Sequence, residues 1–149
     1  MIEATVEQVR LAFTALRSMG AQKLPQKPAW RISRLLGKLK PIVAAFEETQ
    51  LKFFEGLGGQ STDGGMMIPP LERNTGEEDE PWKARLEEHR VAMNNLNKEL
   101  RELNKEVVEI DYNPLPLDMF GDADGTPEHR KMTFSANDLA DLGPFITDE

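Results

Sequence analysis

The stretch Trp82–Val107, "WKARLEEHRVAMNNLNKELRELNKEV", carries the most regular apolar pattern in the chain. Its apolar residues and one histidine recur at alternating steps of four and three residues. Such a repeat is typical of a helix that packs along another helix at a shallow angle. We therefore expect a helix over residues 80–105 with an interaction seam, used within this chain or between copies. The seam consists of Trp82, Leu86, His89, Met93, Leu96, Leu100, Leu103 and Val107.

A helix of matching length is predicted upstream, from near Pro28 to near Gly58. Pro41 falls inside this segment, and a proline crowds the carbonyl group four residues before it. That residue is Gly37, which gives the backbone room to bend. We expect a kinked but continuous helix that can pair with the seam as a hairpin. Its mainly apolar face consists of Ile32, Leu35, Leu36, Leu39, Ile42, Val43, Phe46, Gln50, Phe53 and Leu57.

A shorter amphipathic helix is predicted over residues 2–19, ended by Gly20. Its apolar positions recur at helical spacing, and glycine is a common residue just past a helix end. The stripe consists of Ile2, Val6, Val9, Phe13 and Leu16, widened by Ala12 and Met19.

The C-terminal part has weaker patterns. The segment "EVVEIDY", residues 106–112, alternates as a short strand does, and "KMTF", residues 131–134, is a candidate second strand. Ser135 then precedes "ANDLADL" as the N-cap of a terminal helical turn. Between residues 58 and 79, glycine, proline and charge with little periodicity predict a flexible linker.

Together these patterns predict a mainly α protein, either a long helical hairpin or a three-helix arrangement, with a small two-stranded β element near the C-terminus. We expect one domain over residues 1–149. It comprises N-terminal helices in 1–57, the linker in 58–79, the third helix in 80–105, and short strands, a loop and a terminal turn in 106–149.

Charge is unevenly distributed along the chain, whose formal net charge is −8. Residues 1–57 hold nine basic and five acidic side chains (net +4), whereas residues 58–149 hold nine basic and 21 acidic ones (net −12). This asymmetry indicates either complementarity between the two halves or head-to-tail contact between copies.

The basic run "KLPQKPAWRISRLLGKLKP", Lys23–Pro41, has two readings. Four of its six cations, Arg31, Arg34, Lys38 and Lys40, fall mostly away from the apolar stripe, as on a solvated helix face. Trp30 is then expected to cover the end of the core. The second reading is nucleic-acid binding, but no stacking pair or finger spacing accompanies the run, and the net charge opposes it. We therefore expect no nucleic-acid partner.

Several kinds of chemistry lack the residues they need. The chain has no cysteine, and it contains no phosphate-binding glycine loop, serine elbow or HExxH motif. In "GDADG", residues 121–125, the first and twelfth positions of an EF-hand loop would be Phe120 and Lys131, which supply no carboxylate. A weaker cation site there stays open. His89 and His129 have no partner at metal-ligand spacing. We expect no catalytic residues, no cofactor and no metal.

Four segments carry a resemblance to known proteins. They are "KLPQKPAWR", "AFEE", "EVVEI" and "SANDL", which occur in this order over most of the chain. The combination resembles a group of short proteins of tailed bacteriophages and prophages without an assigned function. The chain departs from that pattern at Pro41 and in its glycine-rich "LGGQSTDGG" segment. The resemblance implies a phage origin and supplies no catalytic residues.

These observations favour a non-enzymatic phage structural or assembly protein. We expect it to dock through its helices on itself or on a larger virion component of the tail, neck or internal head. The alternative is a small phage-encoded inhibitor or modulator that binds a host enzyme or defence protein, with the acidic residues between Glu77 and Asp124 as its binding surface. The expected location is the virion or the host cytoplasm during infection. No signal peptide or apolar run of membrane length is present, so we expect no membrane partner.

Overall fold

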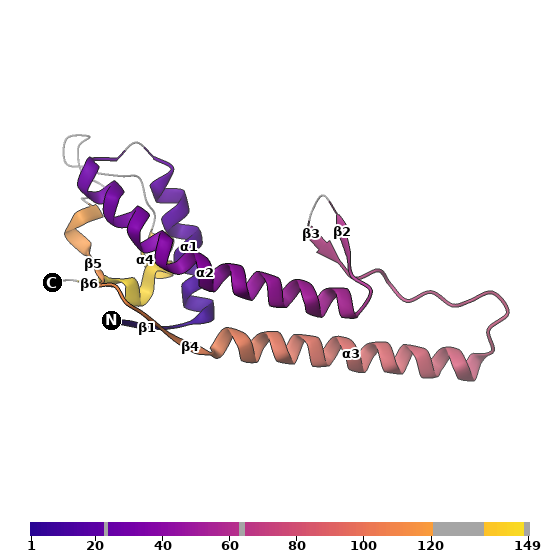
Figure 1. Ribbon diagram of the computed structural model, residues 1–149. Coiled ribbons are helices and arrows are strands. Elements are labelled where there is room, and N and C mark those ends of the chain that lie inside the picture. The colour runs from indigo at the N-terminus through magenta and orange to yellow at the C-terminus, as the bar shows by residue number, and fades with distance from the viewer. Residues whose placement is uncertain (23, 63–64, 121–135, 148–149) are drawn as a thin grey trace. The chain divides into compact units, whose positions relative to one another are not determined.

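The computed structural model describes residues 1–22, 24–62, 65–120 and 136–147 (Figure 1). The described chain is mostly helical, which confirms the predicted mainly α class. Its α-helices are α1 (Val6–Gly20), α2 (Gln26–Gly56), α3 (Asp79–Lys105) and α4 (Ala136–Leu142). The chain divides into two compact units: unit 1 contains Met1–Ala45 and Asn104–Glu149, and unit 2 contains Phe46–Leu103. Unit 1 therefore contains an N-terminal and a C-terminal part of the sequence.

Helix α1 begins at a capping box. The Thr5 hydroxyl accepts a bond from the Gln8 backbone N–H at 3.2 Å, and the Gln8 side chain accepts one from the Thr5 N–H at 2.8 Å. These two bonds satisfy donors that a helix N-terminus otherwise leaves unpaired. The helix ends at Gly20, as predicted.

The predicted start of this helix at Ile2 is wrong. Residues Ile2–Thr5 form strand β1, which pairs antiparallel with β4 (Val107–Ile110), with Ile2 opposite Ile110. Ile2 and Ala4 are buried while Glu3 between them is exposed. This alternation suits a strand with one covered face, and capping by Thr5 stops the helix from extending backwards.

Strand β4 confirms the strand predicted in residues 106–112, but its partner is β1. Residues 131–134, the predicted second strand, and Ser135 lie outside the described residues. Near the C-terminus β5 (Leu115–Pro116) pairs in parallel with β6 (Ile146–Thr147). Short 3₁₀ turns occupy Leu117–Phe120 and Gly143–Phe145, the second directly after α4.

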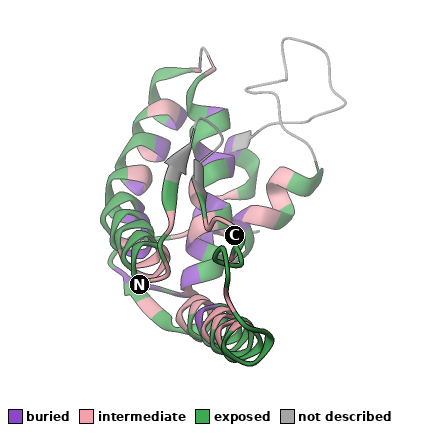
Figure 2. Ribbon diagram, turned by 90° about the vertical axis from the view of Figure 1, so that its right-hand side faces the viewer, coloured by how far each residue is buried: buried purple, intermediate pink, exposed green. Residues whose placement is uncertain are grey.

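The core of unit 1 gathers apolar residues from α1, the first half of α2, β1, β4 and the C-terminal elements. In Figure 2 the helices of this unit carry buried positions along one side and exposed positions along the other. Its fully covered side chains include Val9, Leu16, Leu35, Leu39, Leu142 and Phe145.

Helix α2 is continuous over 31 residues with Pro41 inside it, as predicted. Its first half contributes Ile32, Leu35 and Leu39 to the core of unit 1, and residues from Phe46 onward belong to unit 2. Helix α2 therefore belongs to unit 1 up to Ala45 and to unit 2 from Phe46 onward.

In unit 2 the end of α2 and α3 run in opposite directions (Figure 1), joined by residues 57–78. Helix α2 ends in a Schellman motif. Gly58 adopts φ +78°, its N–H binds the Glu55 carbonyl at 3.0 Å, and the Gly59 N–H binds the Phe54 carbonyl at 2.7 Å. The segment expected to be a flexible linker holds the antiparallel strands β2 (Gln60–Thr62) and β3 (Gly65–Met67).

Candidate functional site

The seam lies almost wholly on α3, and its burial is incomplete. Leu96 is the buried member, with 5% of its surface exposed. Trp82, His89, Met93, Leu100 and Leu103 are half-buried, and 41% of the surface of Leu86 is exposed. A stripe with a partner along its whole length would be covered along that length, so part of the apolar surface of α3 is left exposed within the described residues.

The last seam position does not belong to the helix. Helix α3 ends at Lys105, and Val107 lies in β4 opposite Thr5 with 61% of its surface exposed. Continuing the helical repeat to Val107 was therefore wrong, since the strand interrupts it. The remaining positions, Trp82 to Leu103, lie within unit 2.

A network of arginines and carboxylates fixes the beginning of α3. Arg85 Nη1 lies 2.5 Å from Glu77 Oε1, and the Glu77 carboxylate also accepts the Asn74 backbone N–H at 3.1 Å. Arg73 bonds the Glu77 carbonyl and pairs with Asp79 at 2.6 Å. These donors lower the pKa of Glu77, the Arg85 hydrogen bond most strongly. The network orients the first turn, from which Trp82 begins the seam.

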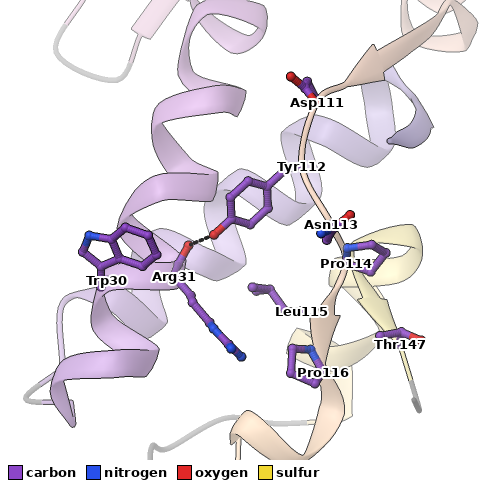
Figure 3. A pocket seen from close by; sticks show the side chains of 9 residues that line it. All are labelled: Trp30, Arg31, Asp111, Tyr112, Asn113, Pro114, Leu115, Pro116 and Thr147. Carbon is purple, nitrogen blue, oxygen red and sulfur yellow. Dashed lines mark hydrogen bonds between the residues drawn. The ribbon is translucent and has the colours of Figure 1, made fainter.

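A cleft of about 490 Å³ lies in unit 1 between the first turns of α2 and the extended segment after β4 (Figure 3). Trp30 and Arg31 form the helix side, and Tyr112 donates its hydroxyl hydrogen to the Arg31 carbonyl at 3.3 Å across the floor. The Arg31 side chain extends into the space between the two walls. The opposite wall consists of Asp111, Asn113, Pro114, Leu115, Pro116 and Thr147.

Trp30 does not cover the core, contrary to expectation. Its surface is 58% exposed, and the Arg34 guanidinium carbon lies 5.1 Å from the centre of its ring system. An indole held against a guanidinium in this way is a cation–π contact on the surface. Ile32 and Leu35 of the same helix are the residues that are buried in the core of unit 1.

Spacing along the sequence does not predict the cleft. Its walls come from residues 30–31, 111–116 and 147, which only the fold brings together. The one local signal is the succession of Tyr112, Pro114 and Pro116, a rigid extended segment with an aromatic residue at its start.

The described residues contain no group of three or more histidine, aspartate or glutamate side chains that could hold a metal ion. His89 lies half-buried in the seam. The GDADG segment and His129 lie outside the described residues. In the part of the chain that the structure describes, no helix combines the length and apolar character needed to cross a membrane.

Comparison with known proteins gave no relative. No protein-family model matches the chain, and no curated protein or solved structure matches it either.

Proposed function

We propose that this chain is a non-enzymatic assembly protein of a tailed bacteriophage that docks through α3 on another protein. The observation that carries the proposal is the incompletely covered seam on a helix of 27 residues. The phage assignment rests on the resemblance of the sequence segments, and the docking mode rests on the seam.

The docking partner is a second copy or a larger component of the particle. Either would cover Trp82, Leu86 and Met93 by laying a helix along α3, the arrangement that a four-and-three repeat favours. Docking by a helix in a groove or along a seam uses anchors at this spacing and needs no catalytic group.

A matched pair of substitutions tests the seam. Leu86→Glu places a charge on the seam at an exposed position, and Ala84→Glu places the same charge on an exposed position of α3 outside the seam. Both variants should keep the helix content of the wild type. Association, measured by light scattering after size exclusion and by melting over a roughly hundredfold concentration range, should be weakened only by Leu86→Glu.

Mass spectrometry of purified particles identifies the partner class. Self-association through the seam points to copies of this chain, and a fixed copy number in particles without self-association points to a larger component. A chain that is monomeric at all concentrations and absent from particles would contradict the proposal.

The alternative is a small inhibitor of a host protein. Exposed carboxylates on α3, including Glu80, Glu87 and Glu88, support it, because an acidic face can compete for a basic binding site. An inhibitor would be made early in infection and be absent from particles, so the same mass-spectrometric measurement separates the two functions.

A further inference from the structure

The surface around the cleft of unit 1 carries cations at regular helical spacing. Lys27, Arg31, Arg34 and Lys38 follow one another at steps of four, three and four residues, which places them on one face of α2. The row is about 16 Å long at 1.5 Å per residue. We call it the basic row.

These cations are available to a ligand. Within the described residues none of the four forms an ion pair, while the ion pairs that the structure shows, such as Arg85–Glu77 and Lys52–Glu48, lie in unit 2. Lys27, Arg34 and Lys38 are exposed, and Arg31 is half-buried because it lines the cleft. A row of positive charges attracts an acidic ligand to this face of α2.

The cleft beside the row suits an extended chain. Trp30 and Tyr112 offer aromatic surface, and Pro114 and Pro116 make the opposite wall rigid. Pro116 also lacks a backbone N–H, so strand β5 cannot offer a complete row of backbone bonds to an added strand. Recognition must then use side chains, as in aromatic-lined grooves that bind extended peptides.

An acidic residue of the cleft argues against a nucleic acid as the occupant. Asp111 lines the cleft itself. Its carboxylate would face the phosphates of a nucleic-acid strand, whereas a peptide can place its uncharged residues or backbone N–H groups there. The single exposed indole also gives only one stacking platform.

From these observations we infer that the cleft and the basic row bind an extended acidic segment of a partner protein. Carboxylates of the segment pair with Arg31, Arg34 and the row lysines, and an apolar or proline side chain lies between Trp30 and Pro116. This surface is separate from the α3 seam and does not depend on the function proposed for that seam.

Fluorescence anisotropy with labelled ten-residue peptides tests the inference. The acidic probe is (Glu-Pro)5, which favours an extended conformation, and (Lys-Pro)5 is the control peptide. The full-length protein should bind (Glu-Pro)5, more weakly as salt is raised, and should not bind (Lys-Pro)5.

Two substitutions on the same helix locate the binding. Arg34→Glu reverses a charge in the basic row, and Lys40→Glu reverses an exposed charge outside it. Arg34→Glu should weaken binding of (Glu-Pro)5 by roughly tenfold or more, the usual effect of losing a hydrogen bond to a charged group. Lys40→Glu should change the affinity for (Glu-Pro)5 by less than about threefold, because Lys40 lies outside the basic row and acts on the peptide only through its long-range charge. Circular dichroism should show equal helix content for both variants.

Three outcomes would overturn the inference. Absence of binding to (Glu-Pro)5 is the first, and equal loss in the two variants, which indicates attraction by net charge alone, is the second. The third is tighter binding of a twelve-nucleotide oligo-dT than of the peptide, lost in Arg34→Glu, which would assign the row to single-stranded nucleic acid. None of these results bears on the seam, which the Leu86→Glu comparison tests separately.

Discussion

Leu96 and Leu86 occupy the same stripe of α3, yet they differ in burial, with 5% and 41% of their surface exposed. We expect Leu96→Ala to lower the free energy of unfolding by about 2–5 kcal/mol, the range for a buried leucine. Leu86→Ala should cost under about 1 kcal/mol in the monomer, as surface changes do. Leu100, which is half-buried, should fall between them. Urea denaturation at low protein concentration measures all three, and equal costs for Leu96 and Leu86 would contradict the burial pattern.

Glu77 gives a prediction about pH at the residue scale. Its pKa is lowered in the folded chain by the Arg85 hydrogen bond, so the ionised form favours folding. The contribution is complete above the pKa of an unfolded glutamate, about 4.3, and is lost as the pH falls through the lowered folded value.

Glu77→Gln should therefore destabilise the protein at pH 7, and its difference from wild type should shrink as the pH is lowered below 4 or so. Denaturation curves at several pH values measure this. Glu88→Gln is the control, because Glu88 is exposed and forms no ion pair within the described residues. A Glu77→Gln difference that does not depend on pH would show that the Arg85 contact contributes no pH-dependent stability.

At the scale of elements, replacing either of two glycines in the α2 region by alanine should change the free energy of unfolding, in opposite directions for the two positions. A Cβ atom at Gly37, inside the helix, would meet nothing within 4 Å, whereas one at Gly59 would lie 2.6 Å from the Phe54 carbonyl oxygen. Gly37→Ala should raise the free energy of unfolding by about 0.5–1 kcal/mol, because alanine loses less backbone entropy in a helix.

Gly59→Ala should lower the free energy of unfolding, because the Schellman motif must open to relieve the contact between the added Cβ atom and the Phe54 carbonyl oxygen. The two variants are compared by thermal melting under identical conditions. Stabilisation by both would mean that the end of α2 tolerates a side chain at Gly59, and destabilisation by Gly37→Ala would mean that the helix beside Pro41 depends on that glycine.

For the whole molecule, the two units differ in how much apolar surface they bury. Unit 1 encloses the large cluster around Leu16, Leu39 and Phe145, whereas the buried apolar side chains of unit 2 within the described residues are Phe46 and Leu96. Local opening is easiest where few apolar contacts are made. We expect amides of α1 to exchange with solvent more slowly than those of α3 at low protein concentration.

Hydrogen exchange followed by mass spectrometry measures this difference. If copies associate through the seam, protection of α3 should increase with concentration while that of α1 stays constant. Slower exchange in α3 than in α1 in the dilute monomer would contradict the burial that the structure assigns to the two units.

The sequence by itself determined where the three long helices lie. Helix α1 from Val6 onward, the long α2 through Pro41, and α3 each follow from local spacing of apolar residues, because a helix forms its hydrogen bonds within a few residues. Strand β4 was also evident from the alternation in residues 106–112. The stripe from Trp82 to Leu103 was predicted for the same reason.

Tertiary structure decided what depends on partners distant in the sequence. Ile2 fits both a helix, four residues before Val6, and a strand, two residues before Ala4; pairing with Ile110 selects the strand. A strand obtains its hydrogen bonds from another segment, so local spacing could not identify that partner. The cleft is a second case, since residues 30–31, 111–116 and 147 meet only after unit 1 has folded, which is also why Trp30 faces solvent and not the core.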